Sequence, residues 1–322
     1  MILYIVFMFN GNGIYSNEKV IELAFHQNDR RMFMDTSDLA KRMKDYESIS
    51  KTKLMKRCPV ICRIDGKAHH NFCRGFKRPF DEVYIKSMQE TAKYLCENLQ
   101  GVVMSYQQSD EITLVFVDYK ELNTSPYFDY EVQKLCSIIA SMATMAFNEF
   151  FSEQVIQLLS SYDTPSQTSK LEQSYYKAMK KGAMFDARVF NIPKEEVTNC
   201  IYWRQLDSTR NSIQMVGQAN FSHKELQNKS CNDIQDMLMT QKGINWNNLP
   251  TYQKRGSCCI KEEYWGDKNT GEKYSDEYNK VLNRIGGNDN DVKRSRWIID
   301  KNIPIFRGEG RDYIEKLVMV GE

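Results

Sequence analysis

The sequence predicts an α+β fold of the ferredoxin type, in which an antiparallel sheet carries helices on one face. The evidence is an apolar run at 58–64, an alternation of apolar and polar residues at 102–117, and apolar residues at helical spacing in 80–99 and 129–151. A further strand-like stretch, DARVFNI at 186–192, completes the order βαββαβ. The rest of the chain is expected to mix helices and strands.

The segment 36–57 begins at a Thr-Ser-Asp cluster whose side chains can accept hydrogen bonds from the free N–H groups of a helix start. Its clearly helical stretch is TSDLAKRMKDYESI, 36–49. The strand at 58–64 follows as a short apolar run. The segment 80–99 then places apolar side chains on one helix face, and Gly101 ends this helix. The residues of that face are Tyr84, Met88, Ala92, Leu95 and Leu99.

A hairpin and a second long helix continue the predicted sheet domain. In the hairpin, a polar turn is followed by a strand in which Ile112, Leu114 and Phe116 lie on one face and the residues between them lie on the other. The helix at 129–151 is followed by a connector at 160–174, which is rich in Ser, Thr and Gln and which we expect to be mobile.

The C-terminal part begins with Pro193, which suits the first turn of a helix. Further along, KRGSCCIKEEYW is predicted to be a strand, and the hydrophilic segment 266–293 a loop. We therefore divide the chain into three regions. They are an N-terminal extension with little order, 1–33, the sheet domain, 34–192, and a mixed C-terminal region, 193–322.

Composition restricts the class of protein. The 322 residues are 41% hydrophobic, enough for a substantial core, and 44 Lys and Arg nearly balance 42 Asp and Glu. Any affinity for nucleic acid must therefore come from a local basic patch. Nine cysteines without a C-x-x-C spacing favour free thiols in a reducing cytoplasm over disulfides or a zinc site. We expect a cytoplasmic protein.

The opening stretch MILYIVFMF is apolar for only nine residues, too short to span a bilayer. It also lacks the basic start and the cleavage site of a secretory signal. We expect no membrane partner. Met32 and Met34 stand just before the first predicted helix, so translation could also begin at one of them.

Acidic residues lie at two neighbouring places in the predicted sheet. Asp65 ends the first strand, and Asp110 with Glu111 lies in the hairpin turn. The first strand and the hairpin are central neighbours, so these carboxylates should converge and repel unless a cation lies between them. Such hard oxygen ligands suit Mg²⁺, and two ions can stabilise both the attacking and the leaving oxygen of phosphoryl transfer. The pattern therefore indicates nucleotidyl transfer.

Gly66 and several basic residues extend this candidate site. A residue without a side chain lets the backbone approach a metal or phosphate closely, and the basic side chains could hold a triphosphate. Simpler readings stay open: a turn at Asp65, an ordinary hairpin connection at Asp110, and packing for His69 and His70. The basic residues are Lys67, Arg74, Lys77 and Arg78.

Three blocks, RIDGKAHHNF, FKRPFDE and SYQQSDEITLVF, resemble the tRNA-His guanylyltransferase family, and the resemblance covers about 34–265. It implies a palm-like catalytic domain at 34–192, with the region 193–322 completing the active site and the RNA-binding surface. It also implies two Mg²⁺ ions, ATP and GTP or other nucleoside triphosphates as substrates, and a homotetramer built from two dimers. The implied reaction adds nucleotides to the 5′ end of tRNA in the 3′-to-5′ direction.

The resemblance assigns catalytic roles to Asp65, Asp110 and Glu111. Asp65 and Asp110 match the metal-binding carboxylates, and Gly66 matches the glycine whose carbonyl oxygen completes the metal shell. Arg78 replaces the usual lysine, which keeps the charge but changes the geometry. The residues assigned to nucleotide activation and triphosphate binding are Lys67, Ala68, His69, His70, Arg78 and Ser109.

The block WRQLDSTRNSI distinguishes two branches of the family. The eukaryotic tRNA-His enzymes typically carry a histidine where this chain has Thr209. This block and the later GINWNNLPTYQKRG resemble the guanylyltransferase-like branch, whose members look like template-dependent repair enzymes for 5′-truncated tRNAs. We therefore expect 5′-end repair, with addition of a single G to tRNA-His as the alternative.

Contacts to tRNA are expected to fall on its phosphates and 2′-hydroxyl groups. Arg204, Arg210 and Asn211 lie on a helix that should be partly buried, so a carboxylate such as Asp207 is the alternative partner for them. The candidate RNA-binding residues are Lys180, Lys181, Arg204, Arg210, Asn211, Lys254 and Arg255, with Lys177, the run 51–57 and the run 293–296 as further candidates.

Two other functions remain open at this point. A nucleotide cyclase shares the predicted topology, but its Gly-Gly-Asp/Glu-Glu-Phe hairpin is missing here. A catalytically silent RNA-binding protein would not require the intact set of Asp65, Asp110 and Glu111.

Overall fold

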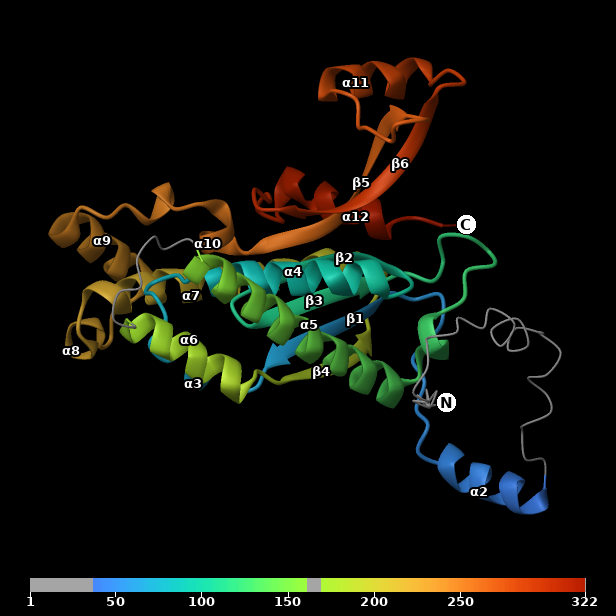
Figure 1. Ribbon diagram of the computed structural model, residues 1–322, viewed down its shortest axis with the longest axis horizontal. Helices are drawn as coiled ribbons and strands as arrows, with labels where there is room; N and C mark the ends of the chain where they lie inside the picture. The colour runs from blue at the N-terminus through green and yellow to red at the C-terminus, as the bar shows by residue number, and fades with distance from the viewer. Residues whose placement is uncertain (1–36, 161–168, 322) are drawn as a thin grey trace, which may run out of the picture. The chain divides into compact units, whose positions relative to one another are not determined.

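One antiparallel sheet of six strands organises residues 52–322 (Figure 1). The computed structural model describes residues 37–160 and 169–321, and residues up to Lys51 belong to a separate unit. The strand order across the sheet is β4-β1-β3-β2-β5-β6, with antiparallel neighbours throughout. The strands are β1 Val60–Gly66, β2 Val102–Gln108, β3 Glu111–Phe116, β4 Phe185–Asn191, β5 Ser257–Asp267 and β6 Asp291–Asp300.

The separate unit contributes one described helix, α2, Asp38–Ser48. Its cap is Ser37, whose hydroxyl accepts a hydrogen bond from the N–H of Ala40 at 3.1 Å. The predicted helical stretch 36–49 is confirmed, because α2 lies within it. Beyond the unit, Lys53 and Lys56 form ion pairs with Asp129. The predicted N-terminal extension lies outside the described residues.

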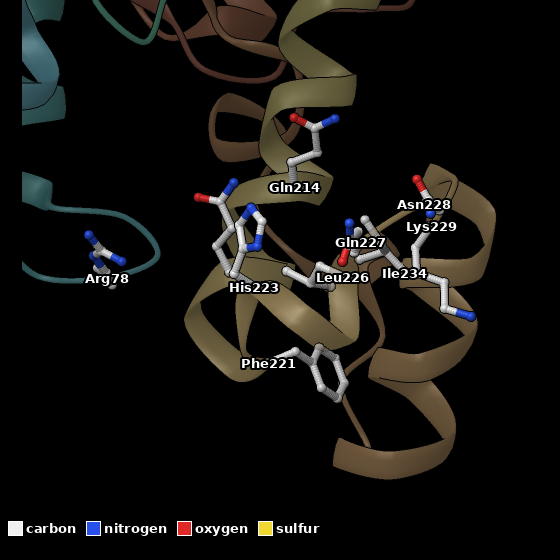
Figure 2. A pocket seen from close by; sticks show the side chains of 10 residues that line it. Arg78, Gln214, Phe221, His223, Leu226, Gln227, Asn228, Lys229 and Ile234 are labelled. Carbon is white, nitrogen blue, oxygen red and sulfur yellow. The ribbon is translucent and has the colours of Figure 1, made fainter.

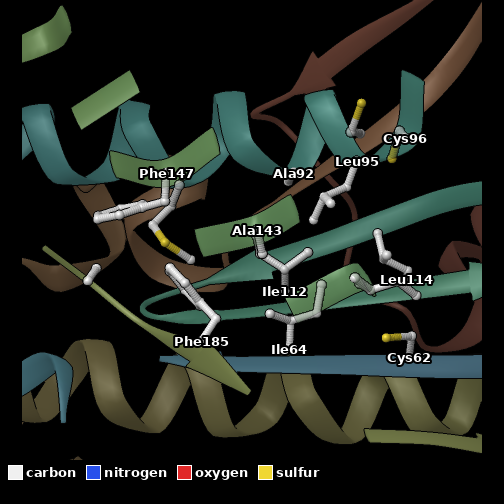
Figure 3. Packing of buried hydrophobic residues seen from close by; sticks show 14 of the residues in the cluster. Cys62, Ile64, Ala92, Leu95, Cys96, Ile112, Leu114, Ala143, Phe147 and Phe185 are labelled. Atoms are coloured by element: carbon white, nitrogen blue, oxygen red, sulfur yellow. The ribbon is translucent and has the colours of Figure 1, made fainter. Parts of the chain in front are cut away.

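One face of the sheet is covered by α4, Glu82–Asn98, and α5, Val132–Ser160, as predicted for the palm-like fold. Figure 3 shows Ile64, Ile112 and Leu114 on the same side of the sheet as Phe147 of α5. These side chains are fully buried. The alternation read in the hairpin is therefore confirmed on this face.

The opposite face of the sheet is covered by helices from the C-terminal region. Val197 of α7, Lys194–Asn220, and Ile314 of α12, Asp312–Val318, pack with Ile61 and Val115. The strand β5 pairs directly with β2, so the regions 34–192 and 193–322 share one sheet. The C-terminal region thus adds a second helix layer to the predicted ferredoxin-type unit.

Among the described residues, α5 is long and apolar enough to cross a membrane by length and composition. Its apolar residues have another explanation. Leu135, Ile139, Ala143 and Phe151 are buried in the hydrophobic core that α5 forms with the sheet and α4.

Two segments predicted to lack regular structure contain helices. Residues 170–174 of the expected connector belong to α6, Lys170–Lys181, which starts with a capping box between Ser169 and Glu172. The expected loop 266–293 contains α11, Asp276–Ile285, which contacts β5 and buries Leu282. Both helices are polar overall with only a narrow apolar face, which explains why composition suggested loops.

The remaining elements are short, and most of them gather at the end of α7. They form a third apolar cluster around Ile213, Ile234 and Trp246. The elements are α3 His69–Phe72, η2 Tyr127–Tyr130, α8 His223–Leu226, α9 Cys231–Lys242, η3 Trp246–Asn248, α10 Thr251–Arg255 and η4 Gly308–Arg311.

Candidate active site

The end of β1 and the hairpin turn meet at one edge of the sheet. Asp65 lies directly opposite Glu111 in the pairing of β1 with β3. The N–H of Gly66 donates a hydrogen bond to the carbonyl oxygen of Asp110 at 3.1 Å. The predicted convergence of Asp65 and Asp110 is thus confirmed, because strand register brings these distant residues together.

The hairpin turn places Asp110 in a position where its charge is unfavourable. Burial raises the pKa of the Asp110 carboxyl, and the negative charge of Asp65 raises it as well, although hydrogen bonds with the Asp110 backbone and Ser109 act in the opposite direction. Ser109 has a φ of 49°, in the left-handed region. The amide of Gln107 donates to the Ser109 carbonyl at 3.0 Å and supports this turn. A bound cation would offset the unfavourable charge of Asp110.

Gly66 has no room for a side chain. A Cβ atom there would lie 2.5 Å from the ring of His69, far inside contact distance. The backbone of Gly66 is therefore packed against His69 on one side and bonded to Asp110 on the other. This agrees with a backbone ligand position, although the carbonyl role itself stays a prediction.

The donor set fits Mg²⁺ better than a transition metal. The described residues contain no group of three or more His, Cys, Asp and Glu residues placed to hold a metal ion. Asp65, Asp110 and the Gly66 backbone offer only oxygen atoms, and Mg²⁺ commonly takes one or two carboxylates and completes its shell with water and substrate phosphates.

Glu111 lies outside the turn, contrary to the sequence prediction. It is the first residue of β3 and its side chain is 7% exposed. Its oxygen atoms accept hydrogen bonds from Nε of Arg204 at 2.7 Å and from Nη2 of Arg204 at 2.6 Å. The carboxylate is therefore held against α7.

Arg204 lies in the protein interior and does not form part of an RNA-binding surface. Besides Glu111, it donates to Asp207 at 3.0 Å, and Asp207 also pairs with Arg210. Burial lowers the pKa of the Arg204 guanidinium, but the hydrogen bonds and charges of Glu111 and Asp207 outweigh burial and raise it. The carboxylate alternative is thus confirmed for Arg204, and Arg210 remains 60% exposed.

The two neighbouring histidines differ in their surroundings. The His69 ring is buried among Phe72, Phe147 and Phe185, and Nδ1 lies 2.7 Å from the Tyr84 hydroxyl. Burial lowers the pKa of His69 to about 4. Packing therefore accounts for this side chain, and only its backbone remains for nucleotide binding. The other nucleotide-binding candidates of this segment are exposed: Lys67, Ala68, His70 and Arg78.

An open cleft of about 650 Å³ separates the loop before α4 from the end of α7. Figure 2 shows Arg78 on one side and His223, Gln227 and Lys229 on the other. Basic and amide groups therefore face each other across this cleft.

The sheet edge that carries Asp65, Gly66 and Asp110 is called the metal edge below. A smaller hollow of about 80 Å³ lies beside it. Ser109 and Asn211 line it together with the aromatic Tyr252. Of the predicted RNA-binding residues, Asn211 is therefore placed beside the hairpin turn. Lys180 and Lys181 are exposed at the end of α6, and Lys254 and Arg255 are half-buried in α10.

Several basic residues considered for RNA already have acidic partners. Lys293 pairs with Glu263, and Arg296 pairs with Glu262 across the β5–β6 hairpin. The runs 51–57 and 293–296 are thus partly neutralised within the protein.

Arg63 and Arg188 lie near the candidate site, since Arg188 interacts with the charges of Asp65 and Glu111, and sequence reasoning missed them. They are direct partners across β1 and β4, two register steps from Asp65. Arg188 donates to Asp186 at 2.9 Å, and among the described residues Nε of Arg63 is buried without a hydrogen-bond partner. The signal was present in RIDG, because residues two apart on a strand share a face.

Comparisons with known proteins found similar sequences and structures. A family model described as tRNAHis guanylyltransferase matches residues 40–193. An uncharacterised protein of Acanthamoeba polyphaga mimivirus is 29% identical over 69% of this chain and 76% of its own length. The tRNA(His) guanylyltransferase of Saccharomyces cerevisiae is 24% identical over 65% of this chain and 85% of its own length.

Two solved structures are also similar. A bacterial tRNA(His) guanylyltransferase-like protein in complex with ATP has a TM-score of 0.66 and 38% identity, covering 87% of this chain and 99% of its own. Its counterpart in complex with GTP has a TM-score of 0.64 and 35% identity, covering 88% of this chain and 100% of its own.

Proposed function

This chain belongs to the tRNA(His) guanylyltransferase family and is a nucleotidyltransferase, and we propose that it repairs 5′-truncated tRNAs by template-dependent 3′-to-5′ nucleotide addition. The observation that carries the proposal is the convergence of Asp65 with Asp110 beside Gly66 at the sheet edge. A silent RNA-binding protein would have no use for two carboxylates that repel each other.

The proposed cofactor is Mg²⁺, as two ions held by Asp65, Asp110 and the Gly66 backbone. When bound, the ions would stabilise negative charge on the attacking and leaving oxygens. The chain's own contribution is to hold the two carboxylates at fixed positions and to exclude alternative geometries through strand pairing. ATP and GTP are proposed as substrates, in keeping with the nucleotides in the two similar structures.

The proposed reaction has two phosphoryl transfers. First, an oxygen of the tRNA 5′-monophosphate attacks the α-phosphorus of ATP, and pyrophosphate leaves. Then the 3′-hydroxyl of an incoming nucleoside triphosphate attacks the activated 5′ phosphorus, and AMP leaves. A 5′-triphosphate end would enter the second step directly and release pyrophosphate. Lys67 and His70 are exposed and follow Asp65 closely in the chain, and Arg78 is exposed on the loop before α4; their positive or hydrogen-bonding groups are proposed to bind the triphosphates.

The large cleft suits the phosphates of the tRNA end. Arg78 and Lys229 provide positive charge on its two sides, while Gln214 and Gln227 provide amide groups. Such groups bind phosphate and sugar oxygens without reading a base sequence, which matches a repair enzyme that accepts different tRNAs.

Repair is favoured over addition of one G by the chemistry of α7. Thr209 replaces the histidine of the eukaryotic pattern, and its hydroxyl donates to the Gln205 carbonyl at 2.9 Å within the helix. The 38% identity to the guanylyltransferase-like bacterial structure supports the same branch. Addition of a single G to tRNA-His is the second candidate function.

The test is incorporation of labelled GTP and other nucleotides into tRNA. Purified protein is given a tRNA lacking its first 5′ nucleotides, the same tRNA with a changed template strand, and full-length tRNA-His. Repair predicts several additions that follow the template. One untemplated G on tRNA-His alone would instead establish the second candidate, and no addition to any substrate would refute both.

Two further proposals concern the state of the protein. One is a cytoplasmic location: the nine cysteines, all within the described residues, are free thiols, and free thiols are usual in a reducing compartment. The homotetramer is proposed from the family resemblance alone, and light scattering of the purified protein would test it.

A further inference from the structure

The Glu111–Arg204 pair is the most completely buried ion pair among the described residues. The two side chains are 7% and 10% exposed, and two short hydrogen bonds join them in a bidentate arrangement. Thr113 lies 3.3 Å from the same carboxylate and can donate a third hydrogen bond. Removing these charges from water has a large cost, so the pair calls for a function besides stability.

The position of Glu111 indicates what that function is. Glu111 directly follows Asp110 in the chain and directly opposes Asp65 across β1 and β3. Any shift of the Glu111 side chain is transmitted to the backbone that carries the Asp110 carboxylate. The turn is therefore held from both ends, by the Gln107 amide on the Ser109 carbonyl and by Arg204 on Glu111.

We propose that Arg204 is a positioning residue of the metal site, acting through Glu111 to hold the Asp110 carboxylate opposite Asp65. The inference rests on the proposed function, because it concerns the metal site which that function requires. Glu111 then orients the hairpin and is not itself a metal ligand, since each of its oxygens is engaged by Arg204.

The same arginine also connects the metal edge to the substrate side of α7. Arg204 is braced by Asp207 one turn along the helix. Ser208 and Asn211, on the following turn, line the hollow beside Ser109. The guanidinium thus fixes the distance between the hairpin turn and the helix that lines this hollow. Lysine would keep the charge but could not form the two parallel hydrogen bonds.

The test measures metal binding directly, by electron paramagnetic resonance of Mn²⁺ added to the full chain, together with the Mg²⁺ concentration required for nucleotide addition. Arg204→Gln and Arg204→Lys should each weaken Mn²⁺ binding about tenfold, the usual effect of losing a group that orients a metal ligand. Asp110→Ala should abolish binding, while Glu111→Gln should weaken it only as far as Arg204→Gln does.

Arg311→Gln is the matched control, because Arg311 also forms a 2.7 Å pair with a glutamate, Glu315, away from the site. Its Mn²⁺ binding should equal that of the wild-type protein. Circular dichroism and thermal melting establish that each variant is folded. If Arg204→Gln does not fold, the double variant Glu111→Gln with Arg204→Gln takes the place of the single variant in the assay. In the double variant neither member of the pair remains as an unpaired buried charge.

Unchanged Mn²⁺ binding and Mg²⁺ requirement in the folded Arg204 variants would overturn the inference. It would also be overturned if Glu111→Gln abolished binding as Asp110→Ala does, because Glu111 would then be a ligand. If wild-type protein binds Mn²⁺ in an Arg204-dependent way but adds no nucleotide to any tRNA, the inference stands and the proposed function fails.

Discussion

Two clusters of ion pairs have similar contact distances but differ in how far water reaches them. In the metal-side cluster, formed by Glu111, Arg204 and Asp207, the central pair is 7% and 10% exposed. In the arm cluster, formed by Glu262, Lys273 and Arg296 on the β5–β6 hairpin and its loop, side-chain exposure runs from 23% to 51%. The shortest contacts are 2.6 Å and 2.8 Å.

The difference shows that burial, more than contact distance, decides what an ion pair does. Water screens the arm cluster, so its charges cost little to separate. The metal-side cluster is removed from water, so either partner alone would be an unpaired buried charge. The same number of charged residues thus forms a cluster closed to water in one place and a solvated cluster in the other.

The largest effect should come from removing the carboxylates that the metal-side cluster supports. Asp65→Ala and Asp110→Ala are each expected to lower nucleotide addition on the order of 1,000-fold, because charge stabilisation at the reacting phosphate is lost. Addition is measured with labelled GTP on a 5′-truncated tRNA. Glu262→Ala, which removes a carboxylate from the arm cluster, is the control and should retain activity. Near-normal addition by either aspartate variant would refute the assignment of the site.

Breaking the metal-side cluster should have the largest effect on stability. Arg204→Ala leaves Glu111 buried without its partner, and the free energy of unfolding is expected to fall by about 3–5 kcal/mol. Urea unfolding followed by circular dichroism measures this change. A loss below 1 kcal/mol would mean that Glu111 regains water easily and that the cluster is not closed to solvent.

Gly66→Ala tests the packing beneath the metal edge. The new Cβ atom would meet the His69 ring at 2.5 Å, and overpacking of this kind lowers the free energy of unfolding by about 1–3 kcal/mol. The double variant Gly66→Ala with His69→Ala should destabilise the protein by less than the sum of the two single changes, because the clash is then absent. Strict additivity in the urea experiments would argue against contact between the two residues.

Binding of tRNA should depend on the large cleft and on salt. Arg78→Ala and Lys229→Ala are each expected to weaken tRNA binding several-fold and to reduce the salt slope by about 1, since each removes one phosphate contact. Filter binding across a range of salt concentrations measures both quantities. Affinity that does not change with salt would contradict an electrostatic tRNA site.

The smallest effect is expected in the arm cluster. Arg296→Ala should change the free energy of unfolding by about 0–1 kcal/mol, because its pair with Glu262 is exposed and screened. Its affinity for tRNA should also stay near that of the wild-type protein, since the guanidinium already has an acidic partner. A tRNA affinity several-fold weaker would restore the run 293–296 as an RNA contact.

Much of the fold followed from local patterns in the sequence. The hairpin, α4, α5 and β5 were predicted because each carries a clear apolar period, and such periods arise from which side chains face a core. The helices α6 and α11 were missed because their apolar faces are narrow. Their stability depends on a capping residue and on packing against another element, which composition does not display.

The residues of the candidate site likewise fall into those that the sequence predicted and those that it missed. The convergence of Asp65, Gly66 and Asp110 was predicted from the sequence because they stand at the end of a recognisable strand and in a recognisable turn. Glu111 was placed in the turn because the sequence cannot show where a hairpin turn ends. Arg63 and Arg188 were missed because their adjacency exists only once β1 and β4 pair.

By itself the sequence determined five of the six strands, the long helices α4, α5 and α7 and the family, because these depend on residues close together in the chain. Only the tertiary structure decided the partners. It turned Arg204 from an RNA contact into the buried partner of Glu111, and it buried His69 while leaving His70 exposed. The physical reason is that burial and charge pairing depend on distances between segments far apart in the chain, and no local pattern encodes those distances.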